Sequence, residues 1–131
     1  FVWFALKDPR VLRETVLWIS NGGRYCAPWN GRHVDVMGLE EVTSYFHGGL
    51  AESVRPNPFL QRGFPTCLTL RLQPPTVVNY IMAVAAIPRG FDRVVAIERT
   101  EKGVTLRAAN GQQVRAAVDV AFLAERGAER A

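Results

Sequence analysis

The 131-residue chain carries 48% hydrophobic and 21% charged residues and a net charge of +4, a balance that excludes disordered and fibrous proteins. No apolar run approaches the ~20 residues of a membrane-spanning helix, so we expect no membrane partner. The arginines are scattered along the chain, whereas nucleic-acid-binding proteins gather their cations on one face, so we expect no nucleic-acid partner.

The first part of the chain predicts two strands. Residues 1–6 are apolar and aromatic, and residues 15–19 are β-branched and aromatic, which favours strands. Between them, Asp8-Pro9 predicts the start of a helix or a turn, because aspartate caps free N–H groups and proline suits the first helical position. Residues 20–23 end the second strand, since asparagine and glycine tolerate positive φ.

A loop rich in sugar-binding groups follows, and residues 34–39 then alternate as a short strand does. We expect this strand to end at Glu40 and Glu41. Residues 42–46 and 50–54 each fit a helical turn, and the glycines after His47 stop the first of them.

The second half predicts further strands. Residues 66–72 alternate most clearly in the whole chain, and residues 77–87 form an apolar run that we interpret as a buried strand. Three more strands are expected, and Asn-Gly between the last two is a strong hairpin signal. These strands span residues 94–99, 103–108 and 114–122.

The sum of seven or eight short strands with little amphipathic helix predicts an all-β antiparallel sandwich with short helical turns. No linker divides the chain, so we expect one domain over residues 1–131, with residues 124–131 frayed. Cys26 and Cys67 lack the spacing of a disulfide framework or a zinc site. They are interpreted as free thiols of a cytoplasmic protein, with one bridge between them left open.

Glu40 is the candidate catalytic residue. A carboxylate at a strand end, beside glycine and apolar residues, is held rigidly and partly desolvated, as a general base requires. The alternative is that Glu40 and Glu41 begin the next helical turn, where negative charge interacts favourably with backbone dipoles.

The candidate binding residues surround Glu40 in the sequence. His33 and His47 match no compact metal motif, so no metal or other cofactor is expected, and their role is structural or ligand hydrogen bonding. An arginine in this loop can form an ion pair with a glutamate or a bidentate hydrogen bond with a ligand. Trp29 can stack on a sugar ring or pack the loop onto the core. Trp18, within a strand pattern, is expected in the core. The predicted substrate-binding set is Arg24, Trp29, Asn30, Arg32, His33 and His47.

Four short pieces between Trp18 and Ser53 carry a family resemblance. They are Ser20-Asn21-Gly22-Gly23-Arg24, Pro28-Trp29-Asn30-Gly31-Arg32, Gly38-Leu39-Glu40 and Gly49-Leu50-Ala51-Glu52. In this order they resemble the aldose 1-epimerase-like branch of the galactose-mutarotase superfamily. The resemblance covers about a third of the chain closely.

The resemblance implies a β-supersandwich, with this chain as its C-terminal part and a sugar cleft on the concave face. It also implies that a late glutamate takes the proton from the anomeric hydroxyl while a histidine of an earlier strand protonates the ring oxygen. Glu40 is similar to that glutamate, and the histidine is expected upstream of Phe1. Related enzymes often continue Gly-Leu-Glu with proline, whereas Glu41 follows here.

We therefore predict an aldose 1-epimerase-like protein that binds a small-molecule sugar or sugar derivative and interconverts its anomers. The alternative is a carbohydrate-binding β-sandwich without turnover. A further alternative is a module that forms a homodimer through exposed edge strands.

Overall fold

The structure, a computed structural model, describes residues 1–125, and the chain divides into two compact units. Unit 1 comprises Phe1–Asp8 and Val77–Ala131, and unit 2 comprises Pro9–Thr76. Strands account for 36% of the described residues and helices for 14%, and every strand pair among them is antiparallel. The β-rich antiparallel class predicted from the sequence is therefore confirmed.

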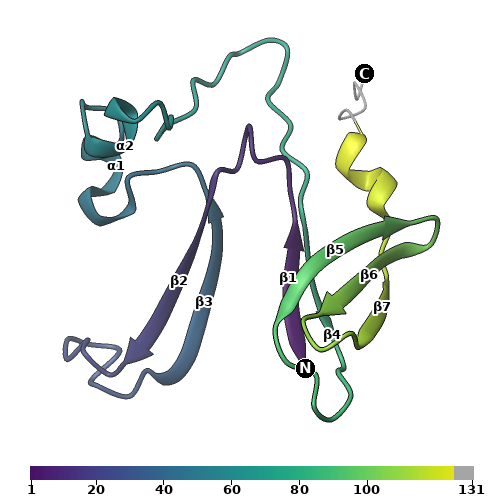
Figure 1. Cartoon of the computed structure of the whole chain (residues 1–131). Helices are drawn as coiled ribbons and strands as arrows, with labels where there is room; N and C mark the ends of the chain where they lie inside the picture. Colours follow the sequence, from purple (N-terminus) through teal and green to yellow (C-terminus); the bar gives the residue numbers. More distant parts are fainter. Residues whose placement is uncertain (126–131) are drawn as a thin grey trace. The chain divides into compact units, whose positions relative to one another are not determined.

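Unit 1 contains two antiparallel sheets (Figure 1). The first pairs β1 (Val2–Leu6) with β4 (Ile81–Ala85). The second sheet consists of β5 (Val94–Thr100), β6 (Gly103–Ala108) and β7 (Gln113–Ala117), with β6 at its centre. The helix η2 (Val120–Ala124) follows β7.

The hydrophobic core of unit 1 joins these two sheets. Phe4 of β1 meets Val104 and Leu106 of β6, and Leu106 is completely buried. Partly buried apolar side chains surround this cluster. They are Val2, Leu6, Ala83, Ala85, Phe91, Val114, Ala116, Val118 and Val120. Within residues 1–125, all fully buried hydrophobic side chains belong to unit 1.

The β6–β7 hairpin turns at the predicted Asn-Gly pair. Gly111 has φ +88°, and the Asn110 side-chain oxygen accepts a hydrogen bond of 3.1 Å from the Gln112 amide. The backbone of Ala108 and Gln112 closes the turn with a 2.8 Å hydrogen bond. The hairpin prediction is confirmed, because only residues that tolerate left-handed φ fit so tight a connection.

Unit 2 is built on a long hairpin of β2 (Glu14–Asn21) and β3 (Val34–Val42), drawn in Figure 1 as two adjacent arrows. Its register is regular from Glu14 to Ile19 and then shifts by one residue. The extra residue lies in β3, where Asp35 takes the left-handed φ of +57°. This β-bulge increases the local twist of the hairpin.

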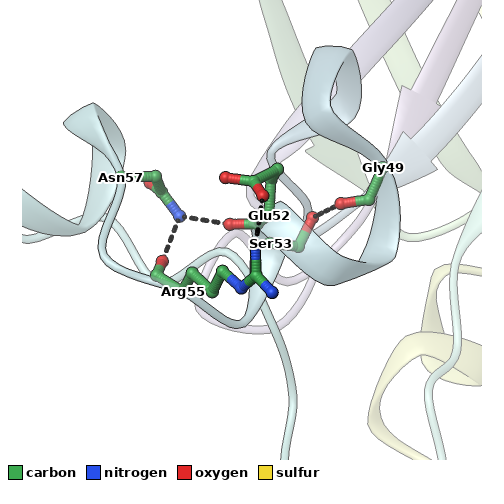
Figure 2. Close-up of polar contacts among 5 residues, drawn as sticks. All are labelled: Gly49, Glu52, Ser53, Arg55 and Asn57. Atoms are coloured by element: carbon green, nitrogen blue, oxygen red, sulfur yellow. Dashed lines mark hydrogen bonds and ion pairs between the residues drawn. The ribbon is translucent and has the colours of Figure 1, made fainter.

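Three short helices follow the hairpin, namely η1 (Phe46–Gly48), α1 (Gly49–Ser53) and α2 (Pro58–Gln61). The interior beneath them is polar. Asn57 is the N-cap of α2, and its side-chain nitrogen donates to the carbonyl oxygens of Glu52 and Arg55, while Ser53 donates to Gly49 (Figure 2). The same nitrogen donates to the Thr66 hydroxyl at 2.9 Å. Hydrogen bonds therefore organise this part of unit 2.

Residues 66–72, the clearest predicted strand, are not a strand. The buried Thr66 hydroxyl is tied to the Ser53 carbonyl at 2.7 Å, whereas Leu70 and Leu72 are exposed. Alternation distinguishes the two faces of a segment, but a strand also needs a second strand beside it to pair with. Residues 66–72 pair with no strand of residues 1–125. The prediction is therefore wrong.

Other predicted boundaries also differ. The strand expected over residues 77–87 is confined to β4, and the strand expected to reach residue 122 ends at Ala117, because Asp119 caps η2 by accepting from the Ala121 amide. At Asp8-Pro9, where a helix or a turn is expected, the structure has the turn. The expected fraying falls mainly on residues 126–131, which lie outside the described residues.

Among residues 1–125, no helix has both the length and the apolar character needed to span a membrane.

Candidate functional site

One face of the β2–β3 hairpin collects several predicted site residues. Directly opposed residues of an antiparallel pair project from the same face. Val16 opposes Glu40, and Trp18 opposes Gly38. The Glu40 carboxylate and the Trp18 indole therefore share a face, while Glu41 projects from the other face and accepts hydrogen bonds from its partner Thr15.

Gly38 makes room for the Trp18 indole. A Cβ atom built on Gly38 would lie 3.3 Å from Cε3 of Trp18 and 3.6 Å from Oε1 of Glu40. The indole thus lies over the glycine, and the carboxylate borders the same spot. Trp18 belongs to the candidate site, although its sequence pattern predicts a core residue. The signal that identifies it is the strand register, which the sequence alone does not provide.

The loop between the strands folds onto itself through backbone hydrogen bonds. The Gly22 amide donates to the His33 carbonyl at 3.1 Å, and the Gly31 amide donates to the Arg24 carbonyl at 2.8 Å. Gly22 and Gly31 adopt φ values of +74° and +68°, which other residues reach only with strain. The loop is therefore a defined structure that positions its side chains.

Four side chains of this region form one cluster. The His33 ring stacks on Trp18 with centroids 5.2 Å apart and lies at the same distance from Trp29. The Arg24 guanidinium carbon stands 5.7 Å from the Trp18 ring centroid and 5.6 Å from that of Trp29, within cation–π range. We call Trp18, Arg24, Trp29 and His33 the aromatic cluster.

Ser20, buried at the end of β2, fixes the orientation of His33. Its hydroxyl donates to the His33 carbonyl oxygen and also lies 3.2 Å from Nδ1 of the ring. Ser20 therefore contacts both the backbone and the ring of His33 at the end of β2.

A small cavity of about 170 Å³ opens beside the aromatic cluster. It is smaller than the ~300 Å³ at which pockets for drug-sized ligands begin. Its walls are Trp18, Ile19, Ser20, Asn21, Gly23, Arg24 and His33.

The remaining predicted binding residues lie outside the aromatic cluster. Asn30 and Arg32 are exposed in the turn of the loop, and neither side chain makes a hydrogen bond or ion pair with the described residues. His47 is exposed in η1, where its ring lies 6.4 Å from that of Phe46. Of the six predicted binding residues, the structure therefore brings together Arg24, Trp29 and His33.

The environment of Glu40 differs from the prediction in two ways. Glu40 is exposed rather than partly desolvated. It also lies inside β3, which continues to Val42, so it neither ends the strand nor begins a helical turn. Glu40 forms no ion pair with Arg24 or Arg32. Its carboxylate is therefore open to solvent and to a ligand.

Within residues 1–125, no group of three or more His, Cys, Asp or Glu side chains is arranged to hold a metal ion. Cys26 and Cys67 are both exposed free thiols. No protein-family model, curated protein or solved structure matches this chain.

Proposed function

We propose that this chain is an aldose 1-epimerase-like, carbohydrate-binding protein whose binding face is the Trp18 face of the β2–β3 hairpin. The observation that carries the proposal is the packing of two indoles, an imidazole and a guanidinium on one another, with the open carboxylate of Glu40 on the same strand face as Trp18. Indole rings present flat apolar surfaces to the C–H face of a sugar. Charged groups form the strong hydrogen bonds that sugar hydroxyls accept and donate.

In the catalytic form of this proposal, Glu40 takes the proton from the anomeric hydroxyl. The bond between the anomeric carbon and the ring oxygen then breaks, and an acid protonates the ring oxygen to give the open-chain aldehyde. Rotation about the adjacent bond and the reverse steps close the ring as the other anomer. We propose that this acid is a histidine, as the family resemblance implies.

The second candidate is a carbohydrate-binding β-sandwich without turnover. The exposure of Glu40 favours it, because a general base usually acts in a site from which water is largely excluded. The two antiparallel sheets of unit 1, packed through Phe4 and Leu106, support the sandwich part of the proposal. We place this sandwich within a galactose-mutarotase-like supersandwich.

Calorimetry and anomer-exchange NMR test the two forms together. Titration with galactose and glucose measures binding, and the rate of anomer interconversion measures turnover. Glu40→Gln is the test variant, and Glu41→Gln is the matched control on the opposite face of the same strand. Turnover that is lost only in Glu40→Gln supports the enzyme, whereas binding without acceleration by the unmodified chain supports the second candidate. Absence of binding to both sugars overturns the proposal.

A further inference from the structure

A larger cavity lies in unit 2, between the segment that enters β2 and the segment around α2. Its volume is about 390 Å³, within the range of small-molecule sites. None of its residues belongs to the aromatic cluster, so it is independent of the proposed sugar site. Its walls are Pro9, Arg13, Glu14, Phe59, Arg62 and Phe64.

The wall that contains Arg13 is fixed by the chain that follows β3. The Arg13 amide donates to the Thr43 hydroxyl oxygen at 3.3 Å, and the Thr43 hydroxyl donates to the Val11 carbonyl. These two hydrogen bonds join positions 30 and 32 residues apart, and they hold the base of the Arg13 side chain in place.

The aromatic wall is fixed as firmly. The Asn57 side-chain oxygen accepts from the amides of Phe59 and Leu60, at 3.0 Å each, while its nitrogen is held as Figure 2 shows. The Phe64 amide donates to the Phe59 carbonyl at 2.9 Å, and the Tyr45 ring packs edge-on against Phe59 with centroids 5.4 Å apart. The two phenyl groups that line the cavity are therefore organised before any ligand binds.

The charged groups of the cavity favour an anion. The Nε–H of Arg13 is shielded from water, and no acceptor among residues 1–125 bonds to it, although buried donors are nearly always satisfied. Arg62 supplies a second, exposed guanidinium. Two guanidinium groups and the one carboxylate of Glu14 leave the lining with a net charge of +1. This charge matches a monoanion better than a phosphate group, which carries about −1.5 to −2 at neutral pH.

We propose that this cavity binds a small aromatic carboxylate. Arg13 and Arg62 bind the carboxylate, since a guanidinium matches the geometry of two carboxylate oxygens. Phe59 and Phe64 contact the ring of the ligand, because aromatic rings pack favourably in stacked or edge-on arrangements.

Isothermal titration calorimetry of the 131-residue chain with 2-naphthoate tests this assignment. We expect 2-naphthoate to bind and the neutral isostere 2-naphthylmethanol to bind at least about tenfold more weakly. Inorganic phosphate should not compete with 2-naphthoate. Equal affinity for the acid and the alcohol overturns the role of the arginines. Phosphate that binds as tightly as 2-naphthoate overturns the aromatic-carboxylate class, and no binding of 2-naphthoate overturns the site.

Variants locate the binding. Arg62→Ala, an exposed change that leaves the fold intact, is expected to weaken 2-naphthoate binding about tenfold, and Arg13→Ala at least as much. Arg71→Ala removes the same charge from an exposed position of unit 2 outside the cavity and is the matched control. An equal loss in Arg62→Ala and Arg71→Ala means that binding follows net charge alone and overturns the proposal.

Discussion

Trp18 lies directly across the β2–β3 hairpin from Gly38, and its Cε3 atom is 3.3 Å from the point where a Cβ of residue 38 would stand. Gly38→Val therefore has to push the indole away and loosen the aromatic cluster. We expect a loss of about 1–3 kcal/mol in the free energy of unfolding, typical of overpacked sites, with weakened near-UV circular dichroism and sugar binding. Met37→Ala, on the opposite face of the hairpin, is the control. An unchanged near-UV spectrum for Gly38→Val contradicts the account.

Gly103 is the described glycine of unit 1 where a side chain fits least. Its φ is +140°, and a Cβ would overlap the Ala116 carbonyl oxygen. Gly103→Ala therefore combines backbone strain with a clash. We expect it to lower the free energy of unfolding, measured in urea, by more than about 3 kcal/mol.

The control for this change is Gly111→Ala, where φ is also positive but the surroundings are open. In Gly111→Ala, only the strain of the left-handed backbone should lower the free energy of unfolding, by about 1–2 kcal/mol. Similar losses for the two variants show that the clash at Gly103 is relieved by movement of β7.

Asn57 holds the polar interior of unit 2 together. Asn57→Ala removes the α2 cap and the hydrogen bond to Thr66, so we expect a loss of at least about 2 kcal/mol in stability. Hydrogen exchange should show the amides of Phe59 and Leu60 losing protection first. Gln61→Ala, an exposed change in the same helix, should leave both amides protected.

Two leucines test where the apolar interior lies. Leu106 is completely buried and Leu72 is 99% exposed. Leu106→Ala should destabilise the chain by about 2–5 kcal/mol, as cavity-forming changes do, and Leu72→Ala by no more than about 0.5 kcal/mol. Thermal or chemical unfolding measures both. A large effect of Leu72→Ala means that a surface outside the described contacts covers this residue.

The contrast between Asn110-Gly111 and residues 66–72 shows what the sequence can predict. The first is correctly predicted because the turn depends on local φ preferences. The second is wrong because pairing depends on whether another strand lies beside the segment, which alternation does not encode. Strand register explains the site as well, since the shift between Ile19 and Asn21 determines the face on which His33 stacks on Trp18. The exposure of Glu40 likewise depends on the tertiary packing around β3.

The bulge at Asp35 decides on which face of the hairpin the loop closes. Side chains alternate along a strand with a period of two, so a single additional residue in β3 exchanges the faces of everything beyond it. With this residue present, His33 meets Trp18 and Ser20. In a variant that lacks Asp35, β2 and β3 would still pair, but the His33 imidazole would project from the face of Leu17 and Ile19. Insertions and deletions at this one position therefore switch the chemistry of the hairpin while preserving its backbone.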